Sequence, residues 1–96
     1  MEFLIIVSSA TLRDEIDQLF ESNGITGFTC VPQATGSGKG GGTRLNDETW
    51  PGENSMYLLA ITSDQAAAVK AWVREYRKSV VREGLKLFAL GLKEVI

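Results

Sequence analysis

Two continuous apolar runs constrain the fold of this chain more than any other feature. Phe3 to Val7 and Met56 to Thr62 each have the length of a β-strand, and neither alternates apolar with polar residues. Each run is followed by a segment whose apolar residues recur at helical spacing, with charged residues between them. The chain therefore contains two similar strand–helix halves, which fit a single domain of 96 residues (1–96).

The first predicted helix follows Thr11, a capping residue with Asp14 as a weak partner three positions later. The helix covers about 12 residues, and Asn23-Gly24 marks its end. The residues of its apolar stripe are Leu12, Ile16, Leu19 and Phe20.

The second predicted helix is capped by Thr62 or Ser63, and Gly84 stops it. Its apolar stripe contains Ala66, Val69, Val73, Tyr76 and Val80. Basic residues lie on the opposite side of the helix and continue past its end: Lys70, Arg74, Arg77, Lys78, Arg82 and Lys86.

These basic residues have two interpretations, an electropositive rim above an anion site or a solvated helix face with i,i+4 partners. We favour the solvated face for Lys70 and Arg74. We favour contact with an anion for Arg82 and Lys86, because they flank the Gly84 loop.

Two further strands complete the pattern. Ile25 to Ala34 is the second strand, with a break expected near Gly27 or Pro32, and Lys86 to Leu92 is the last. The order β-α-β-loop-β-α-β predicts a ferredoxin-like α+β fold, with two helices on one face of a four-stranded antiparallel sheet. Because the strands do not alternate, the other face also needs a cover. We therefore expect an obligate oligomer in which the sheets of several subunits pack together.

A glycine-rich run lies between the two halves. Residues 36–42 contain half of the ten glycines of the chain, together with Lys39. The run matches Gly-x-Gly-x-x-Gly, but no helical pattern follows it, so a dinucleotide fingerprint is excluded. A P-loop also fails, because Gln33 replaces its first glycine and Gly40 replaces its Ser or Thr. An anion-binding nest of backbone N–H groups and a flexible hairpin linker remain as alternatives.

Other single residues have weaker signals. Trp50 in the polar loop is either an anchor for a partner or a cap that folds back on the loop base. Trp72 is expected in the core or an interface, and Cys30 as a small buried hydrophobe. The loop carboxylates match no known metal-site spacing, so we expect them to be solvated: Asp47, Glu48 and Glu53.

Composition excludes several classes of function. The chain has no histidine, which removes His-ligated zinc, Ser-His and Cys-His pairs and a histidine base, so we expect no enzyme. A net charge of −2 lacks the positive charge that is typical of nucleic-acid-binding proteins. No apolar run has the length of a membrane span, and no basic region precedes the first run. With Cys30 as the only cysteine, these features indicate a cytoplasmic protein.

Three segments of the chain resemble segments of one known protein family. Gly24 to Thr29 resembles the turn into the second strand of the PII-like signalling proteins. Gly36 to Lys39 resembles the entry to their long T-loop, and Arg82 to Phe88 resembles their B-loop and fourth strand. The spacing of the three segments agrees, and the resemblance covers essentially the whole chain.

The resemblance implies a homotrimer in which three sheets face inward. It also implies that an adenine nucleotide (ADP, AMP or ATP) binds in each cleft between subunits, as an effector and not as a tightly bound cofactor. By resemblance, the base and ribose meet Gly27, Phe28 and Thr29. The phosphates meet Gly36, Ser37, Gly38 and Lys39 and are clamped by Arg82, Gly84 and Lys86.

Residues 36–55 correspond to a mobile T-loop, through which a transporter or regulatory enzyme is bound by Arg44 and Trp50. This loop is shorter than in nitrogen regulatory protein P-II, has no tyrosine for nucleotidylation and has no glutamine after Gly38. The chain therefore looks like the divergent PII-like members associated with membrane transport, and sensing of 2-oxoglutarate is not expected.

Two rival functions use related folds. A trimeric CutA-like protein binds divalent metal, and the lack of histidine argues against it. An acylphosphatase needs a phosphate-cradling loop with an arginine directly after the first strand, where this chain has Ser8-Ser9-Ala10-Thr11.

Overall fold

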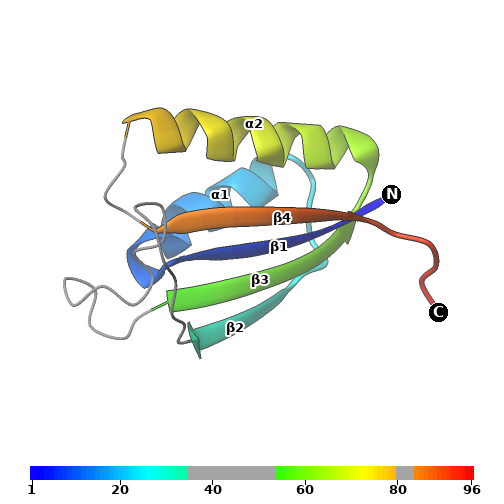
Figure 1. Cartoon of the computed structure of the whole chain (residues 1–96), viewed down its shortest axis with the longest axis horizontal. Coiled ribbons are helices and arrows are strands. Elements are labelled where there is room, and N and C mark those ends of the chain that lie inside the picture. Colours follow the sequence, from blue (N-terminus) through cyan, green and yellow to red (C-terminus); the bar gives the residue numbers. More distant parts are fainter. Residues whose placement is uncertain (35–53, 80–83) are drawn as a thin grey trace.

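The computed structural model describes residues 1–34, 54–79 and 84–96. The strands form one sheet of order β2-β3-β1-β4, in which every neighbouring pair is antiparallel. Both helices cover the same face of this sheet (Figure 1). This is the predicted ferredoxin-like fold. Its elements in chain order are β1 (Glu2–Ser9), a 3-10 turn (Ala10–Leu12), α1 (Arg13–Ser22), β2 (Thr29–Ala34), β3 (Asn54–Ile61), α2 (Ser63–Ser79) and β4 (Leu85–Gly91).

The core lies between the helices and the covered face of the sheet. Alternate residues of the central strands point into it, such as Leu4 and Ile6 of β1 and Leu59 of β3, each no more than 1% exposed. The predicted stripe of α1 is buried, as are the first three residues of the stripe of α2, whereas Val80 lies outside the described residues. Trp72 is half-buried and stacks on Tyr76 with ring centroids 5.2 Å apart.

The end of α1 agrees with the sequence, but its start does not. Gly24 has a φ of +69°, a conformation that glycine adopts readily, and the Ile25 N–H donates to the Phe20 carbonyl oxygen at 2.9 Å. The predicted cap Thr11 is wrong: the Ser9 hydroxyl accepts from the Thr11 N–H at 3.3 Å. Because β1 runs on to Ser9, Thr11 already lies inside the first turn.

The start of α2 is a capping box. Thr62 Oγ1 accepts from the Gln65 N–H at 3.1 Å, and Gln65 Oε1 accepts from the Thr62 N–H at 3.1 Å. The amide of Gln65 also donates to the Asn23 carbonyl oxygen at 3.2 Å. This side chain therefore holds the start of α2 against the end of α1.

The second strand begins later than predicted, at Thr29 instead of Ile25. Ile25 is 4% exposed and completes the end of α1, so its backbone is not available to the sheet. The predicted break near Pro32 is confirmed by a register shift between Val31 and Ala34, since proline has no N–H for a ladder bond. No helix in the described ranges is long and apolar enough to cross a membrane.

Candidate functional site

The predicted nucleotide-binding residues fall partly outside the described residues. Those outside are Gly36, Ser37, Gly38, Lys39 and Arg82, together with the predicted partner contacts Arg44 and Trp50. The described ones are Gly27, Phe28, Thr29, Gly84 and Lys86.

The described residues lie at opposite edges of the sheet. Thr29 begins β2 and Lys86 lies in β4, and these two edge strands are separated by β3 and β1. The structure therefore does not bring the two groups together within one chain. A single site that used both edges needs two copies of the protein.

At the β2 edge, Gly27 and Thr29 are exposed. A side chain added at Gly27 meets no atom within 4 Å of its Cβ, so the surface there is open. Phe28 is different, because its ring lies 4.9 Å from the Phe20 ring and 6.4 Å from the Tyr57 ring, measured between centroids. Its side chain is partly buried and packs against the core.

At the β4 edge, the buried Gly84 is joined to β1, because its carbonyl oxygen accepts from the Ser9 N–H at 3.0 Å. Lys86 pairs with Val7 in the sheet register. Since Leu85 is part of the core and successive strand residues alternate, Lys86 lies on the uncovered face.

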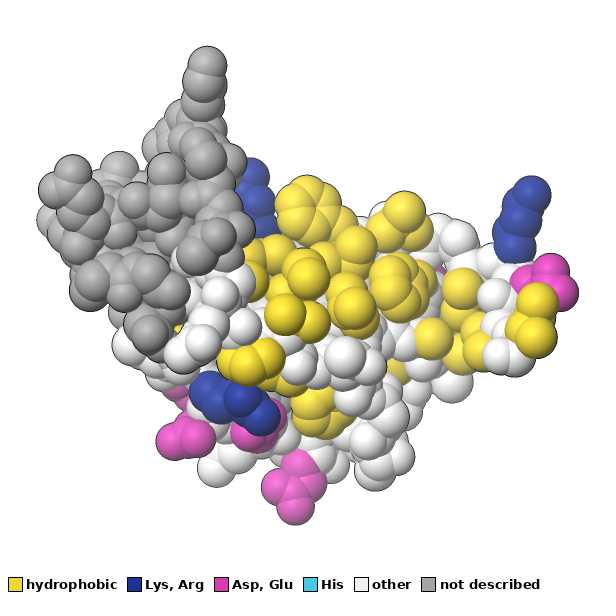
Figure 2. All heavy atoms as spheres, turned by 90° about the horizontal axis from the view of Figure 1, so that it is seen from below, with side chains coloured by type: hydrophobic (Ala, Val, Ile, Leu, Met, Phe, Trp, Pro, Cys, Tyr) yellow, Lys and Arg dark blue, Asp and Glu magenta, His cyan; other side chains and the backbone are white. Residues whose placement is uncertain are grey.

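The uncovered face of the sheet is apolar. Figure 2 shows hydrophobic side chains gathered over this face, and Phe88 and Leu90 are each 50% exposed. Alternation and the strand register place the following residues there: Phe3, Ile5, Val7, Met56, Leu58, Ala60, Phe88 and Leu90. The sequence predicted that this face needs a cover, and no element in the described ranges covers it.

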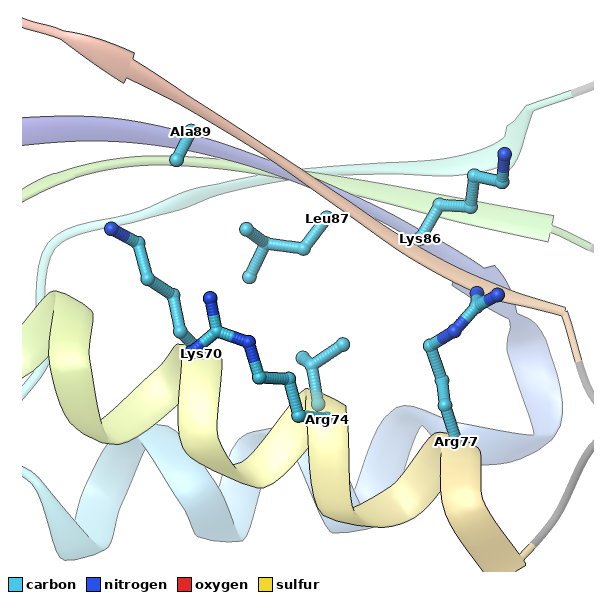
Figure 3. Close-up of a pocket in the computed structure, with 7 residues that line it drawn as sticks. Lys70, Arg74, Arg77, Lys86, Leu87 and Ala89 are labelled. Carbon is cyan, nitrogen blue, oxygen red and sulfur yellow. The ribbon is translucent and has the colours of Figure 1, made fainter.

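A basic groove of about 420 Å³ lies between α2 and β4. From α2 it receives Lys70, Arg74 and Arg77, which Figure 3 shows on the helix side of β4. Lys70 Nζ lies 2.7 Å from Glu2 Oε1, and Arg77 donates to the Leu85 carbonyl oxygen. Its other lining residues are Val73, Lys86, Leu87 and Ala89.

This groove corrects one expectation. Lys70 has no partner one turn away on its own helix; its partner Glu2 comes from β1, because no acidic residue of α2 is close enough. No acidic side chain in the described ranges pairs with Arg74. The signal in the sequence was the spacing of 4 and then 3 between Lys70, Arg74 and Arg77, which places three cations on one stripe.

Tyr57 has a strongly raised pKa. Burial raises the pKa of Tyr57 to about 12, so the phenol is neutral near pH 7. The nearby Cys30 adds to this increase, whereas Arg13, whose guanidinium carbon lies 6.0 Å from the ring centroid, opposes it. Cys30, expected to be buried, is half-buried against the core. A neutral, buried phenol supports a structural role for Tyr57.

No protein-family model and no curated protein sequence matches this chain, but solved structures do. CPII from Thiomonas intermedia, bound to ADP, AMP and acetate, aligns with a TM-score of 0.69 and 12% identity, covering 97% of this chain and 88% of that one. CPII bound to ADP and bicarbonate aligns at 0.67 and 13%, covering 93% and 84%. A chain from Thermus thermophilus, assigned to the PII-like signalling proteins, aligns at 0.64 and 18%, covering 93% and 85%.

The fold is that of the PII-like proteins. At these identities the likeness concerns the fold and carries no residue roles. The PII-like fold agrees with the resemblance read from the three segments of the sequence. The CutA-like alternative receives no support from these structures, and the described part of the chain contains no cluster of three metal-ligating side chains.

Proposed function

We propose that this chain is a non-enzymatic, PII-like regulator that binds an adenine nucleotide between the subunits of a homotrimer. The observation that carries the proposal is the position of the predicted contacts on opposite edges of the sheet, with Gly27 and Thr29 at β2 and Gly84 and Lys86 at β4. Residues at opposite edges meet only across a boundary between two copies. The CPII structures of the same fold are bound to ADP and AMP.

The open apolar face supports the assembly. Side chains such as Leu58 and Phe88 gain a large area of contact if three copies turn this face inward. Such packing covers the apolar side chains that no described element of the chain covers. It also holds the β2 edge of one subunit close to the β4 edge of the next.

Within the proposed cleft, the residues have separate roles. Gly27, Phe28 and Thr29 line the base and ribose, and the partly buried ring of Phe28 is held in place by its contact with Phe20. Lys86 lies on the uncovered face, where a charge near the phosphates is favourable. The remaining phosphate contacts are assigned on sequence resemblance alone: Gly36, Ser37, Gly38, Lys39, Arg82 and Gly84.

The proposed output is a change in affinity for a partner in the cytoplasm. Nucleotide binding orders the loop of residues 36–55 and thereby alters its affinity for a transporter or a regulatory enzyme, with Arg44 and Trp50 as the contacts. A nucleotide shifts this equilibrium only by as much as it prefers one loop state over the other.

Calorimetry with ATP, ADP and AMP tests the binding. We expect at least one nucleotide to bind, and Lys86→Ala to weaken it about tenfold through loss of a charged phosphate contact. Lys93→Ala, which removes an equally charged side chain beyond β4, is the matched control and leaves the affinity unchanged. No heat with any of the three nucleotides at about 1 mM contradicts the proposal.

Mixing two variants tests the position between subunits. Gly27→Trp blocks the β2 side, where the added side chain has open space, and Lys86→Ala weakens the β4 side. After unfolding and refolding the two variants together, random mixing leaves roughly one quarter of the clefts with both sides intact. Binding at wild-type affinity then returns to these clefts. A site contained within one chain recovers nothing on mixing.

A further inference from the structure

Another groove, of about 380 Å³, lies between α1 and α2 and is called the aromatic groove below. Its lining residues come from both helices: Glu15, Gln18, Leu19, Ser22, Trp72 and Tyr76. We propose that the aromatic groove binds an arginine side chain presented by a basic segment of a partner protein. Three features support this occupant: the position of the groove, its pair of stacked rings and its carboxylate.

The aromatic groove lies away from the proposed trimer interface and the proposed nucleotide cleft. The helices cover one face of the sheet, whereas the proposed trimer packs through the other face (Figure 1). Three of the lining residues of α1 are exposed on the helix layer: Glu15, Gln18 and Ser22. The described nucleotide contacts are not among the lining residues. The groove therefore stays accessible in the proposed trimer.

The stacked rings offer a flat surface to a planar cation. Trp72 and Tyr76 lie one turn apart on α2, and their rings stack with centroids 5.2 Å apart and planes 26° apart. Both side chains are only partly buried, so part of each ring remains at the surface. The face of an aromatic ring attracts a cation, and the indole of tryptophan does so most strongly. Exposed tryptophan at a groove is also typical of the residues that dominate binding to a partner.

Glu15 lies level with these rings. The two helices contact each other and are antiparallel, because Gln65 at the start of α2 donates to the Asn23 carbonyl oxygen at the end of α1. Glu15 comes eight residues before Asn23. The position eight residues after Gln65 is Val73, next to Trp72. Since both helices rise about 1.5 Å per residue, one guanidinium can stack on the indole and pair with the Glu15 carboxylate.

The charge of the aromatic groove favours a cation. Glu15 is the one charged residue among the described lining residues, and no basic side chain of the described ranges pairs with it. α1 carries four carboxylates and one cation, Arg13, which already pairs with Asp17 at 3.3 Å. These carboxylates repel the phosphates of a nucleotide. An aliphatic segment leaves Glu15 unpaired, and lysine has no planar group to stack on Trp72. Arginine uses both the ring and the carboxylate.

Fluorescence anisotropy with a labelled peptide of alternating Arg and Ser tests the charge requirement on the assembled protein. We expect this peptide to bind at least about tenfold more tightly than the same peptide with citrulline, which keeps the shape of arginine without its charge. Equal binding of the two peptides shows that the groove takes an uncharged segment and overturns the proposal. No binding of the arginine peptide at about 1 mM overturns it as well.

Three variants locate the peptide in the aromatic groove. Trp72→Leu weakens binding about tenfold and Glu15→Gln about fivefold. Glu21→Gln removes the same kind of carboxylate from an exposed position of α1 outside the groove. It is the matched control and stays within about twofold. Equal losses in Glu15→Gln and Glu21→Gln indicate general attraction to the acidic helix and overturn the proposal.

The folding of the variants is checked by circular dichroism and thermal unfolding. Trp72 is partly buried, so Trp72→Leu is the variant whose fold most needs this check. Glu15 is exposed, so Glu15→Gln still tests the groove if Trp72→Leu does not fold. The titrations contain no nucleotide. A failure of arginine binding therefore leaves the proposed nucleotide-binding function standing, and a failure of nucleotide binding leaves the aromatic groove standing.

Discussion

The two faces of the sheet have similar side chains but opposite environments. On the face under the helices, Leu4, Ile6 and Leu59 are at most 1% exposed. On the other face, Ile5 and Leu58 are equally apolar, yet nothing in the described part of the chain covers them. Neighbouring residues of one strand therefore differ only in what packs against them. An apolar strand sequence therefore predicts that both faces need a cover, but it does not say what supplies the cover.

A charge on the open face has the largest expected effect. Leu58 lies opposite Ile5 of β1 and Thr29 of β2, so it is near the middle of this face. Leu58→Asp places a carboxylate from every copy inside the proposed trimer interface, where it loses its hydration. We expect the variant to be a monomer of 10.5 kDa by light scattering, while the wild type is a trimer.

The matched control adds the same carboxylate to the outer surface of α1. Gln18→Asp changes an exposed residue on the helix layer and leaves the wild-type assembly intact. A trimeric Leu58→Asp variant contradicts the proposal that this face forms the interface.

The covered face responds differently to truncation. Leu59 is 1% exposed within the core of a single chain, and Leu59→Ala leaves a cavity there. We expect a loss of about 2–5 kcal/mol in the free energy of unfolding, as for other buried leucines. Denaturant titration of the variant in the Leu58→Asp background measures this loss without the contribution of assembly. A loss below about 1 kcal/mol contradicts the distinction between the two faces.

Most of the fold followed from the sequence, because the apolar runs and helical stripes are local patterns. The errors lie where one element decides the end of another. Thr11 is a suitable capping residue by type, but β1 extends to Ser9, which caps the turn itself. The first turn therefore begins at Ala10 and includes Thr11. Ile25 was a sound strand residue by type, but its N–H completes the end of α1. Such competition between elements depends on the tertiary structure, so a short stretch of sequence does not reveal it.

The candidate site was less predictable. The partner of Lys70 is Glu2, far away in the chain, so a rule based on helical spacing did not find it. The assignment of Phe28 as a ligand contact rested on a turn sequence that does not show where its ring packs. In contrast, the placement of Thr29 and Lys86 at opposite edges follows from the order of the elements alone.

Tyr57 extends the comparison to alkaline pH, because it precedes Leu58 and points into the covered face. Its pKa is about 12 in the fold against 10.0 for the free side chain. Since the folded value is the higher one, its contribution to stability is complete below pH 10 and is lost as the pH rises towards 12. Between pH 9 and 11, we expect a loss of about 1 kcal/mol in the free energy of unfolding, which Tyr57→Phe abolishes.

The other tyrosine of the chain serves as the control. Tyr76 is half-buried on α2, where its ring stacks on Trp72. Urea titrations at the two pH values are compared for the wild type, Tyr57→Phe and Tyr76→Phe. An equal alkaline loss in Tyr57→Phe and wild type shows that Tyr57 is not the source.

The smallest effect comes from the capping box that begins α2, which helps to hold this helix over the covered face. Thr62→Ala removes the hydroxyl that accepts from the Gln65 N–H and costs about 1 kcal/mol in the free energy of unfolding. Thr62→Ser keeps a hydroxyl at this position and recovers most of the loss. Because the cap lies away from the open face, light scattering shows the wild-type assembly for both variants. A shift of Thr62→Ala to monomers indicates that assembly through the open face depends on the position of the helices on the covered face. The two faces are then not independent.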